Sequence, residues 1–199
     1  MKLYFSLIAL TQTILMSISI VILLVLPFSI AFFPDTFTTG VTTSLYALAH
    51  YFLLFVMSVR PLADIIPKTN WIRPLVILRK GAGVFSASII MSFIFAKIII
   101  DPSNFFGSFG TTAYWSFTQF AIFAHTADIS AFLLLITSNK LSKRLLGAWW
   151  KRIQRLSYVY FYGSSLYLYL VFDQTIMAHF MLFVTTITLL AFIKNQFKK

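Results

Sequence analysis

Two histidines and one aspartate lie inside long apolar stretches of the sequence, where an ionisable side chain is costly and points to a function. His50 is near the middle of the stretch 41–59, and His125 is near the middle of 112–137. Asp128 follows His125 by one turn, so their side chains share one face of a helix. An imidazole and a carboxylate at this spacing can bind a cation or pass a proton, and two histidines at one depth could hold a haem or a metal ion.

Each of these residues also has a purely structural interpretation. A buried histidine can donate one hydrogen bond to a carbonyl of a neighbouring helix and have no further role. We expect Asp128 to be held by a Ser, Thr or Tyr across a helix interface, because helix packing in lipid often uses such bonds. A proton or cation site formed by Asp128 and His125 is the functional alternative.

The composition is that of a membrane protein. Of the 199 residues, 59% are hydrophobic and only 11% are charged, whereas a soluble domain has about 25% charged residues. The net charge is +11, yet the basic residues gather in short segments between apolar stretches, which is typical of membrane topology and not of a nucleic-acid surface. The chain has no Cys, which excludes disulfides, thiolate metal sites and iron–sulfur clusters. We therefore expect the lipid bilayer as a partner and no nucleic acid.

Six apolar stretches are long enough to cross a bilayer, which takes roughly 17–25 residues. Each should be a helix, because backbone groups in hydrocarbon must find their hydrogen bonds within their own segment. The predicted fold is all-α, an integral membrane six-helix transmembrane bundle that forms a single domain over residues 1–199. The helices are expected at about 5–32, 41–59, 82–100, 112–137, 153–172 and 175–193.

The charges between these stretches predict the orientation. Every second connection is basic, and the other three carry only Asp35, Asp101 and Asp173. Because Lys and Arg stay on the cytoplasmic side, the N- and C-termini are expected in the cytoplasm. The basic residues assigned to that side are Arg60, Lys68, Arg73, Arg79, Lys80, Lys140, Lys143, Arg144, Lys151, Arg152, Arg155, Lys194, Lys198 and Lys199.

Four short motifs resemble the ferric reductase-like transmembrane family. They are SVRPL at 58–62, LRKGAG at 78–83, TSN at 137–139 and LGAWWKRIQRL at 146–156. Their order and spacing are similar to those of the six-helix membrane subunit of the bacterial periplasmic methionine sulfoxide reductase system. The similarity covers residues 40–172. It implies a protein of the bacterial inner membrane that moves electrons through haem b, with a periplasmic oxidoreductase or a cytoplasmic flavin electron donor as partner.

The resemblance also implies haem-ligand histidines on the third and fifth helices, and this sequence lacks them. At the corresponding positions it has Phe93, Gln154 and Tyr167. We therefore expect a haem-free membrane component that binds or anchors a partner, and no catalytic residue of its own. Two alternatives stay open, namely an electron-transfer subunit with a haem relocated to His50 and His125, and a small proton or ion transporter that uses His125 and Asp128.

Overall fold

The computed structural model describes residues 2–67, 69, 71–117 and 120–197, and these form helices joined by turns, without a strand among them. Three basic residues counted above, Lys68, Lys198 and Lys199, lie outside the described residues. The elements are α1 (Lys2–Phe32), η1 (Pro34–Thr36), α2 (Thr39–Ile65), α3 (Ile72–Leu75), η2 (Val76–Leu78), α4 (Arg79–Ile100), α5 (Pro102–Ser108), α6 (Ala121–Thr137), α7 (Lys140–Leu146), α8 (Ala148–Gln154), α9 (Leu156–Phe172) and α10 (Thr175–Gln196).

Among the described residues, four helical segments are long and apolar enough to cross a membrane by themselves. They are α1, α2, α10 and the segment Ile72–Ile100, which α3, η2 and α4 form together. Helix α6 qualifies only together with α7, and these two helices are bent by 98° at their junction. Helices α6 and α9 have 17 residues each, which is about 25 Å of helix. The structure thus supports an all-helical integral membrane protein with four or five helices of spanning length.

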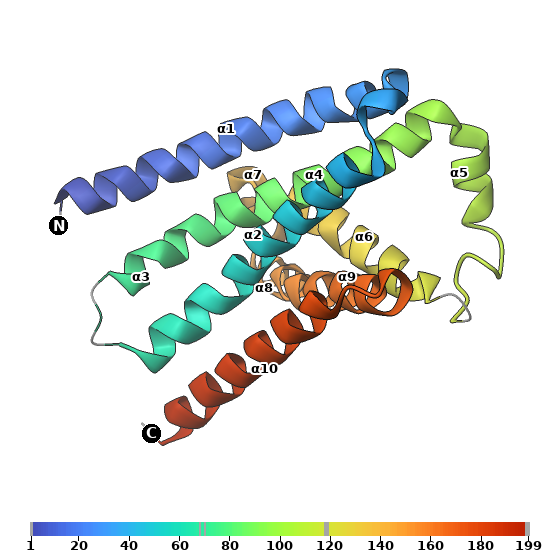
Figure 1. Ribbon diagram of the computed structural model, residues 1–199. Coiled ribbons are helices and arrows are strands. Elements are labelled where there is room, and N and C mark those ends of the chain that lie inside the picture. The colour runs from blue at the N-terminus through green and yellow to red at the C-terminus, as the bar shows by residue number, and fades with distance from the viewer. Residues whose placement is uncertain (1, 68, 70, 118–119, 198–199) are drawn as a thin grey trace.

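The long helices pack side by side in an order that differs from their order in the chain. Helix α1 packs mainly on α4, α4 on α2, and α2 on α10, while α6 and α9 pack on each other and join this layer through α4, α2 and α10. In Figure 1 the start of α1, the end of α10 and helix α3 lie at one end of the molecule. The turn η1, helix α5 and the junction between α9 and α10 lie at the other end.

Five of the six predicted stretches coincide with helices, with ends that differ by three residues or fewer except at the end of α2, which lies six residues beyond the predicted one. The stretch 112–137 differs, because its helix begins only at Ala121. In the segment before it, the ring N–H of Trp115 donates to the carbonyl of Phe109 at 3.0 Å. The centroid of the Tyr114 ring lies 4.7 Å from that of Phe109 and 5.3 Å from that of Trp115. These apolar residues pack as an aromatic cluster and do not extend the helix. Residues 118–119 lie outside the described residues.

Small residues on α4 allow close approach of α1. Ser88 and Ser92 are buried on α4, one turn apart, and the Ser92 hydroxyl lies 2.7 Å from the Ser88 carbonyl and 3.3 Å from the Ile22 carbonyl of α1. The N–H of Gly81 donates to Oε1 of Gln12 at 3.1 Å. A Cβ at position 81 would lie only 2.8 Å from that oxygen. Contact through small residues and polar bonds is the ordinary way in which helices associate in lipid.

Gly163 has the same role between α9 and α6. A Cβ at position 163 would lie 3.0 Å from the carbonyl oxygen of Phe123 and 3.3 Å from Cβ of Ala127. Ala127 and Ala131 are buried one turn apart on α6. The absence of a side chain at Gly163 therefore fixes how closely α9 approaches α6.

Candidate functional site

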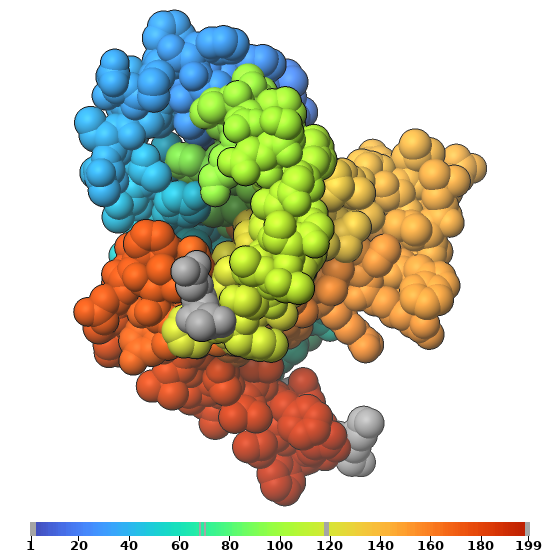
Figure 2. Space-filling model, turned by 90° about the vertical axis from the view of Figure 1, so that its right-hand side faces the viewer, coloured from blue at the N-terminus to red at the C-terminus, as the bar shows by residue number. Residues whose placement is uncertain are grey.

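A cavity of about 650 Å³ lies between the second half of α4, α5, the segment after it and α6. Figure 2 views the molecule from this side, with α5 and the following segment in lime green across its centre. A largely apolar cavity of this size with a few polar groups is the usual form of a small-molecule site. The apolar wall consists of Met91, Ile94, Phe95, Ile98, Ile100, Phe105, Phe106, Phe109, Ile129 and Phe132, and the polar groups are Lys97, Asp101, Asn104, Ser108, Tyr114, His125 and Asp128.

His125 and Asp128 line this cavity from the same face of α6, as their spacing predicts. The His125 ring stacks on Tyr114, with centroids 3.4 Å apart and planes inclined by 11°, and its Nδ1 is buried without a hydrogen-bond partner. The Asp128 carboxylate likewise has no hydrogen bond or ion pair with any residue that the structure describes. Among the described residues the interhelical clasp expected for Asp128 is therefore not formed, and the cavity is lined by a carboxylate without a partner.

Asp101, the second carboxylate of the cavity, already accepts hydrogen bonds within the protein. Oδ1 of Asp101 accepts the backbone N–H of Asn104 at 3.0 Å and the hydroxyl of Ser103 at 2.8 Å, which caps the start of α5. These bonds, the Asn104 N–H first, hold the pKa of Asp101 below its usual value. Asp101 stabilises α5, and Asp128 is the carboxylate that remains available to a ligand.

Lys97 and Tyr114 line this cavity as well, although the sequence had suggested no chemical role for Lys97 and had not indicated Tyr114. Lys97 is an exposed residue of α4 that lines the cavity and lies close enough to interact electrostatically with Asp128 and His125. Tyr114 comes from the aromatic segment before α6 and provides the ring on which His125 stacks. The places of both residues in the cavity depend on contacts between distant parts of the chain. The only indication in the sequence was that Lys97 is a charged residue within an apolar stretch.

His50 lies away from the cavity, in the core between α2 and α9. Its side chain is 2% exposed, with Nδ1 2.8 Å from the Tyr46 carbonyl and Nε2 3.1 Å from the Ser164 hydroxyl. Because a carbonyl can only accept, Nδ1 carries a proton and donates it. The Ser164 hydroxyl lies 2.7 Å from the Tyr160 carbonyl as well. Both ring nitrogens of His50 are thus engaged, Nδ1 within α2 and Nε2 in the bond that joins α2 to α9.

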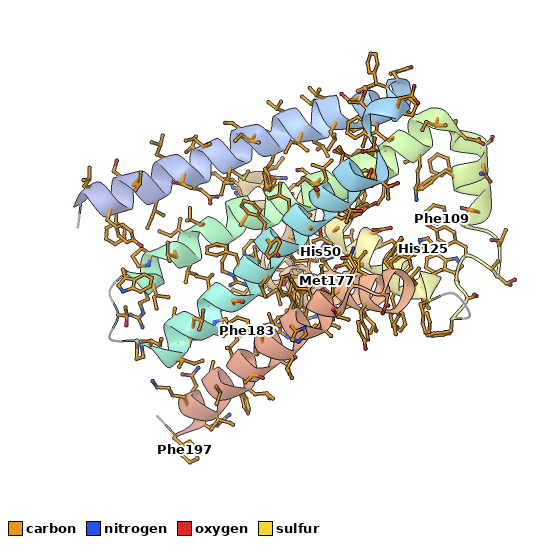
Figure 3. The ribbon with its side chains drawn as sticks, in the orientation of Figure 1. His50, Phe109, His125, Met177, Phe183 and Phe197 are labelled. Carbon is orange, nitrogen blue, oxygen red and sulfur yellow. The ribbon has the colours of Figure 1, made fainter. Side chains whose placement is uncertain are left out.

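This arrangement does not fit a haem or a metal ion shared by His50 and His125. Neither nitrogen of His50 is available as a ligand, and His50 does not line the cavity that His125 lines. In Figure 3 His50 is in the middle of the bundle, whereas His125 is near Phe109 at the α5 end. Within the described part of the chain, no group of three or more His, Cys, Asp or Glu could hold a metal ion.

Two of the three residues at the positions that the resemblance assigns to haem ligands pack against aromatic rings, and the third is a buried amide. Phe93 stacks on Tyr46 of α2 with ring centroids 4.6 Å apart, and Tyr167 contacts Phe172 edge to face at 5.8 Å. Gln154 is the last residue of α8, and its Nε2 is buried without a partner. Phe93 on α4 and Tyr167 on α9 therefore each pack against another aromatic ring.

No protein-family model matches the chain, and the comparisons with curated proteins and with solved structures gave no match either. The resemblance to the ferric reductase-like family therefore depends on the four sequence motifs alone. The cavity with its unpaired Asp128 and His125, and the fully bonded His50, are the features from which a function can be inferred.

Proposed function

We propose that the protein is a haem-free membrane component whose cavity between α4, α5 and α6 binds an amphipathic small molecule. In this proposal the chain crosses a bacterial inner membrane six times, through α1, α2, Ile72–Ile100, α6, α9 and α10, with both termini in the cytoplasm. The observation that carries the proposal is the unpaired carboxylate of Asp128, one turn from an unpaired nitrogen of His125, in a largely apolar cavity.

The wall of the cavity favours a ligand with an apolar body and an ammonium head. Phenylalanine and isoleucine side chains can bury a hydrocarbon chain. An ammonium group would form a charge-assisted hydrogen bond with Asp128, and such bonds are roughly twice as strong as neutral ones. Two carboxylates and one lysine line the cavity, so the formal charge of its wall is negative and also favours a cation. Lys97 is exposed and can turn its own ammonium toward water or a lipid phosphate.

The probe for this proposal is a long-chain alkylamine that carries a dansyl group at the far end of its chain. We expect saturable, blue-shifted emission on titration into the purified protein in detergent, and displacement by an unlabelled alkylamine. Displacement by lysophosphatidylethanolamine as well would indicate a lipid source for the ligand, and displacement by the amine alone would indicate a soluble one. Equal displacement by an alkyl sulfate of the same length would contradict selection of an ammonium head.

A filling substitution shows whether the probe occupies the cavity. Ile129 lines the cavity, and Ile136 lies two turns further along α6 outside it, with a similar exposure. Ile129→Trp should abolish saturable binding, and Ile136→Trp should leave it unchanged. Loss of binding in both variants, or in neither, would place the probe elsewhere on the protein.

The absence of haem is tested separately. After expression with excess haem, we expect no Soret band that shifts on reduction with dithionite, because both nitrogens of His50 are engaged. A shifting band that is lost in His50→Ala and in His125→Ala would instead favour electron transfer through a relocated haem. The redox partner implied by the family, a periplasmic oxidoreductase or a flavin donor, stays a prediction.

Passage of a proton or a cation is a second candidate function. The observation that favours it is that His125 and Asp128 face one cavity next to Lys97. It predicts ion flux in liposomes that disappears in Asp128→Asn. The ligand-binding function predicts no flux, so the two are distinguishable in one reconstituted preparation.

A further inference from the structure

Helices α7 and α8 form a basic projection that the cavity does not involve. We refer to residues 140–154 as the α7–α8 elbow. Figure 2 shows it as the amber part that extends away from the rest of the molecule. The elbow contains no Asp or Glu, and its basic residues are Lys140, Lys143, Arg144, Lys151 and Arg152.

The direction of the elbow changes sharply at its start. Helix α7 is bent by 98° from α6, so a spanning α6 leaves α7 parallel to the membrane surface. The side chain of Asn139 begins α7 by accepting the N–H of Ser142 at 2.7 Å. Gly147, with a φ of 51°, makes the turn from α7 to α8. The elbow is thus an ordered element with a fixed direction.

Large apolar side chains stand exposed among the cations of the elbow. Leu141 and Leu145 lie one turn apart on α7 and are 65% and 75% exposed, and Trp149 on α8 is 62% exposed. Exposed Leu and Trp beside Lys and Arg are typical of a helix that lies in the membrane interface, with its apolar side chains in the acyl boundary. Water contact at these three side chains would be unfavourable.

The two tryptophans of the elbow differ in their contacts and exposure. The ring N–H of Trp150 donates to the Thr137 carbonyl at 3.0 Å, which fastens the elbow to the end of α6, and Lys143 lies 5.4 Å from the same ring. Trp149 is exposed, with the guanidinium of Arg152 4.4 Å from its ring. Trp150 therefore fixes the elbow, and Trp149 remains free to contact lipid.

We infer that the α7–α8 elbow binds the surface of an anionic bilayer. Leu141, Leu145 and Trp149 enter the leaflet, and the five cations contact the phosphates of anionic phospholipids. An uninterrupted positive charge favours anionic lipid over zwitterionic lipid, with each cation near the surface adding to the attraction. This inference does not rest on the ligand-binding function, because it uses none of the residues of the cavity.

The lack of any cysteine allows a single-site test on the full chain. Leu145→Cys is labelled with the fluorophore NBD, and the protein is placed in nanodiscs of phosphatidylcholine, with or without phosphatidylglycerol. We expect a blue shift and protection from the aqueous quencher iodide when phosphatidylglycerol is present. In the labelled protein, Lys140→Gln with Arg144→Gln should remove this difference and weaken retention of phosphatidylglycerol by about tenfold.

A charge-matched control separates this site from the general attraction of a basic protein for anionic lipid. Arg73→Gln with Lys80→Gln removes two exposed cations outside the elbow, so it should leave the label unchanged and weaken lipid retention less than the elbow variant does. Equal losses in the two double variants would overturn the inference. A label that stays exposed to iodide in phosphatidylglycerol but is protected by added soluble polyglutamate would also overturn it and favour an acidic protein as partner.

Discussion

Asp128→Asn is expected to weaken binding of the alkylammonium probe by at least about tenfold, which corresponds to about 1.4 kcal/mol. The substitution keeps the size of the side chain and removes the negative charge that faces the cavity without a partner. In a largely apolar cavity this charge is poorly screened by water, so its attraction for an ammonium head is stronger than on an open surface. Titration of the dansyl probe into detergent-purified wild type and variant gives the ratio of the two affinities.

Asp101→Asn provides the matched control. It removes the same charge from the same cavity, but Asp101 already accepts bonds from Asn104 and Ser103. Asn caps a helix about as well as Asp does, so α5 should remain intact. We expect little change in affinity for the probe. Equal losses in the two variants would show that the probe responds to the total charge of the cavity and not to a contact with Asp128.

Gly163→Leu is expected to give the largest loss of stability. Even a Cβ at this position would lie 3.0 Å from the backbone of α6, and the further carbons of leucine must push α9 and α6 apart. Overpacking of this kind costs about 1–3 kcal/mol, which lowers the apparent Tm of a chain of this size by on the order of 2–12 °C. Thermal unfolding in detergent, followed by the loss of the monodisperse peak in size-exclusion chromatography, measures the shift.

Gly107→Leu is the control for this substitution. Gly107 lies in α5, and a Cβ at this position would have no heavy atom within 4 Å, so a side chain there meets open space. We expect the apparent Tm of this variant to stay close to that of the wild type. Gly163→Leu should also weaken binding of the dansyl probe, because α6 positions His125 and Asp128. A wild-type Tm for Gly163→Leu would mean that α6 and α9 are not held at the distance described.

The long apolar stretches allowed most helices to be predicted from the sequence. The stretches 5–32 and 175–193 coincide with α1 and α10 because a chain in hydrocarbon has to satisfy its backbone within each segment. The length of α2 was underestimated. Pro61 suggested a break at 59, yet it lies buried within α2, which continues to Ile65. Hydropathy indicates which segments are apolar, but it does not fix where the helix ends.

The candidate site could be predicted only where its residues belong to one helix. The spacing of His125 and Asp128 places both on one face of α6, and both do line the cavity. His50 and His125 were expected at the same depth, but equal depth does not bring two residues together, because the rotation of each helix about its axis decides which neighbour a side chain meets. The approach of Lys97 to Asp128 likewise follows from the packing of α4 on α6.

The shortness of α6 and α9 has a consequence for the surrounding lipid. These neighbouring helices have 17 residues each and reach about 25 Å, against a hydrocarbon thickness of about 30 Å. In the proposed six-crossing topology the bilayer beside them has to become thinner, and such hydrophobic mismatch costs fractions of a kcal/mol per Å. The protein should therefore partition toward thinner membranes, and changes in acyl-chain length would act first on the helix that carries His125 and Asp128.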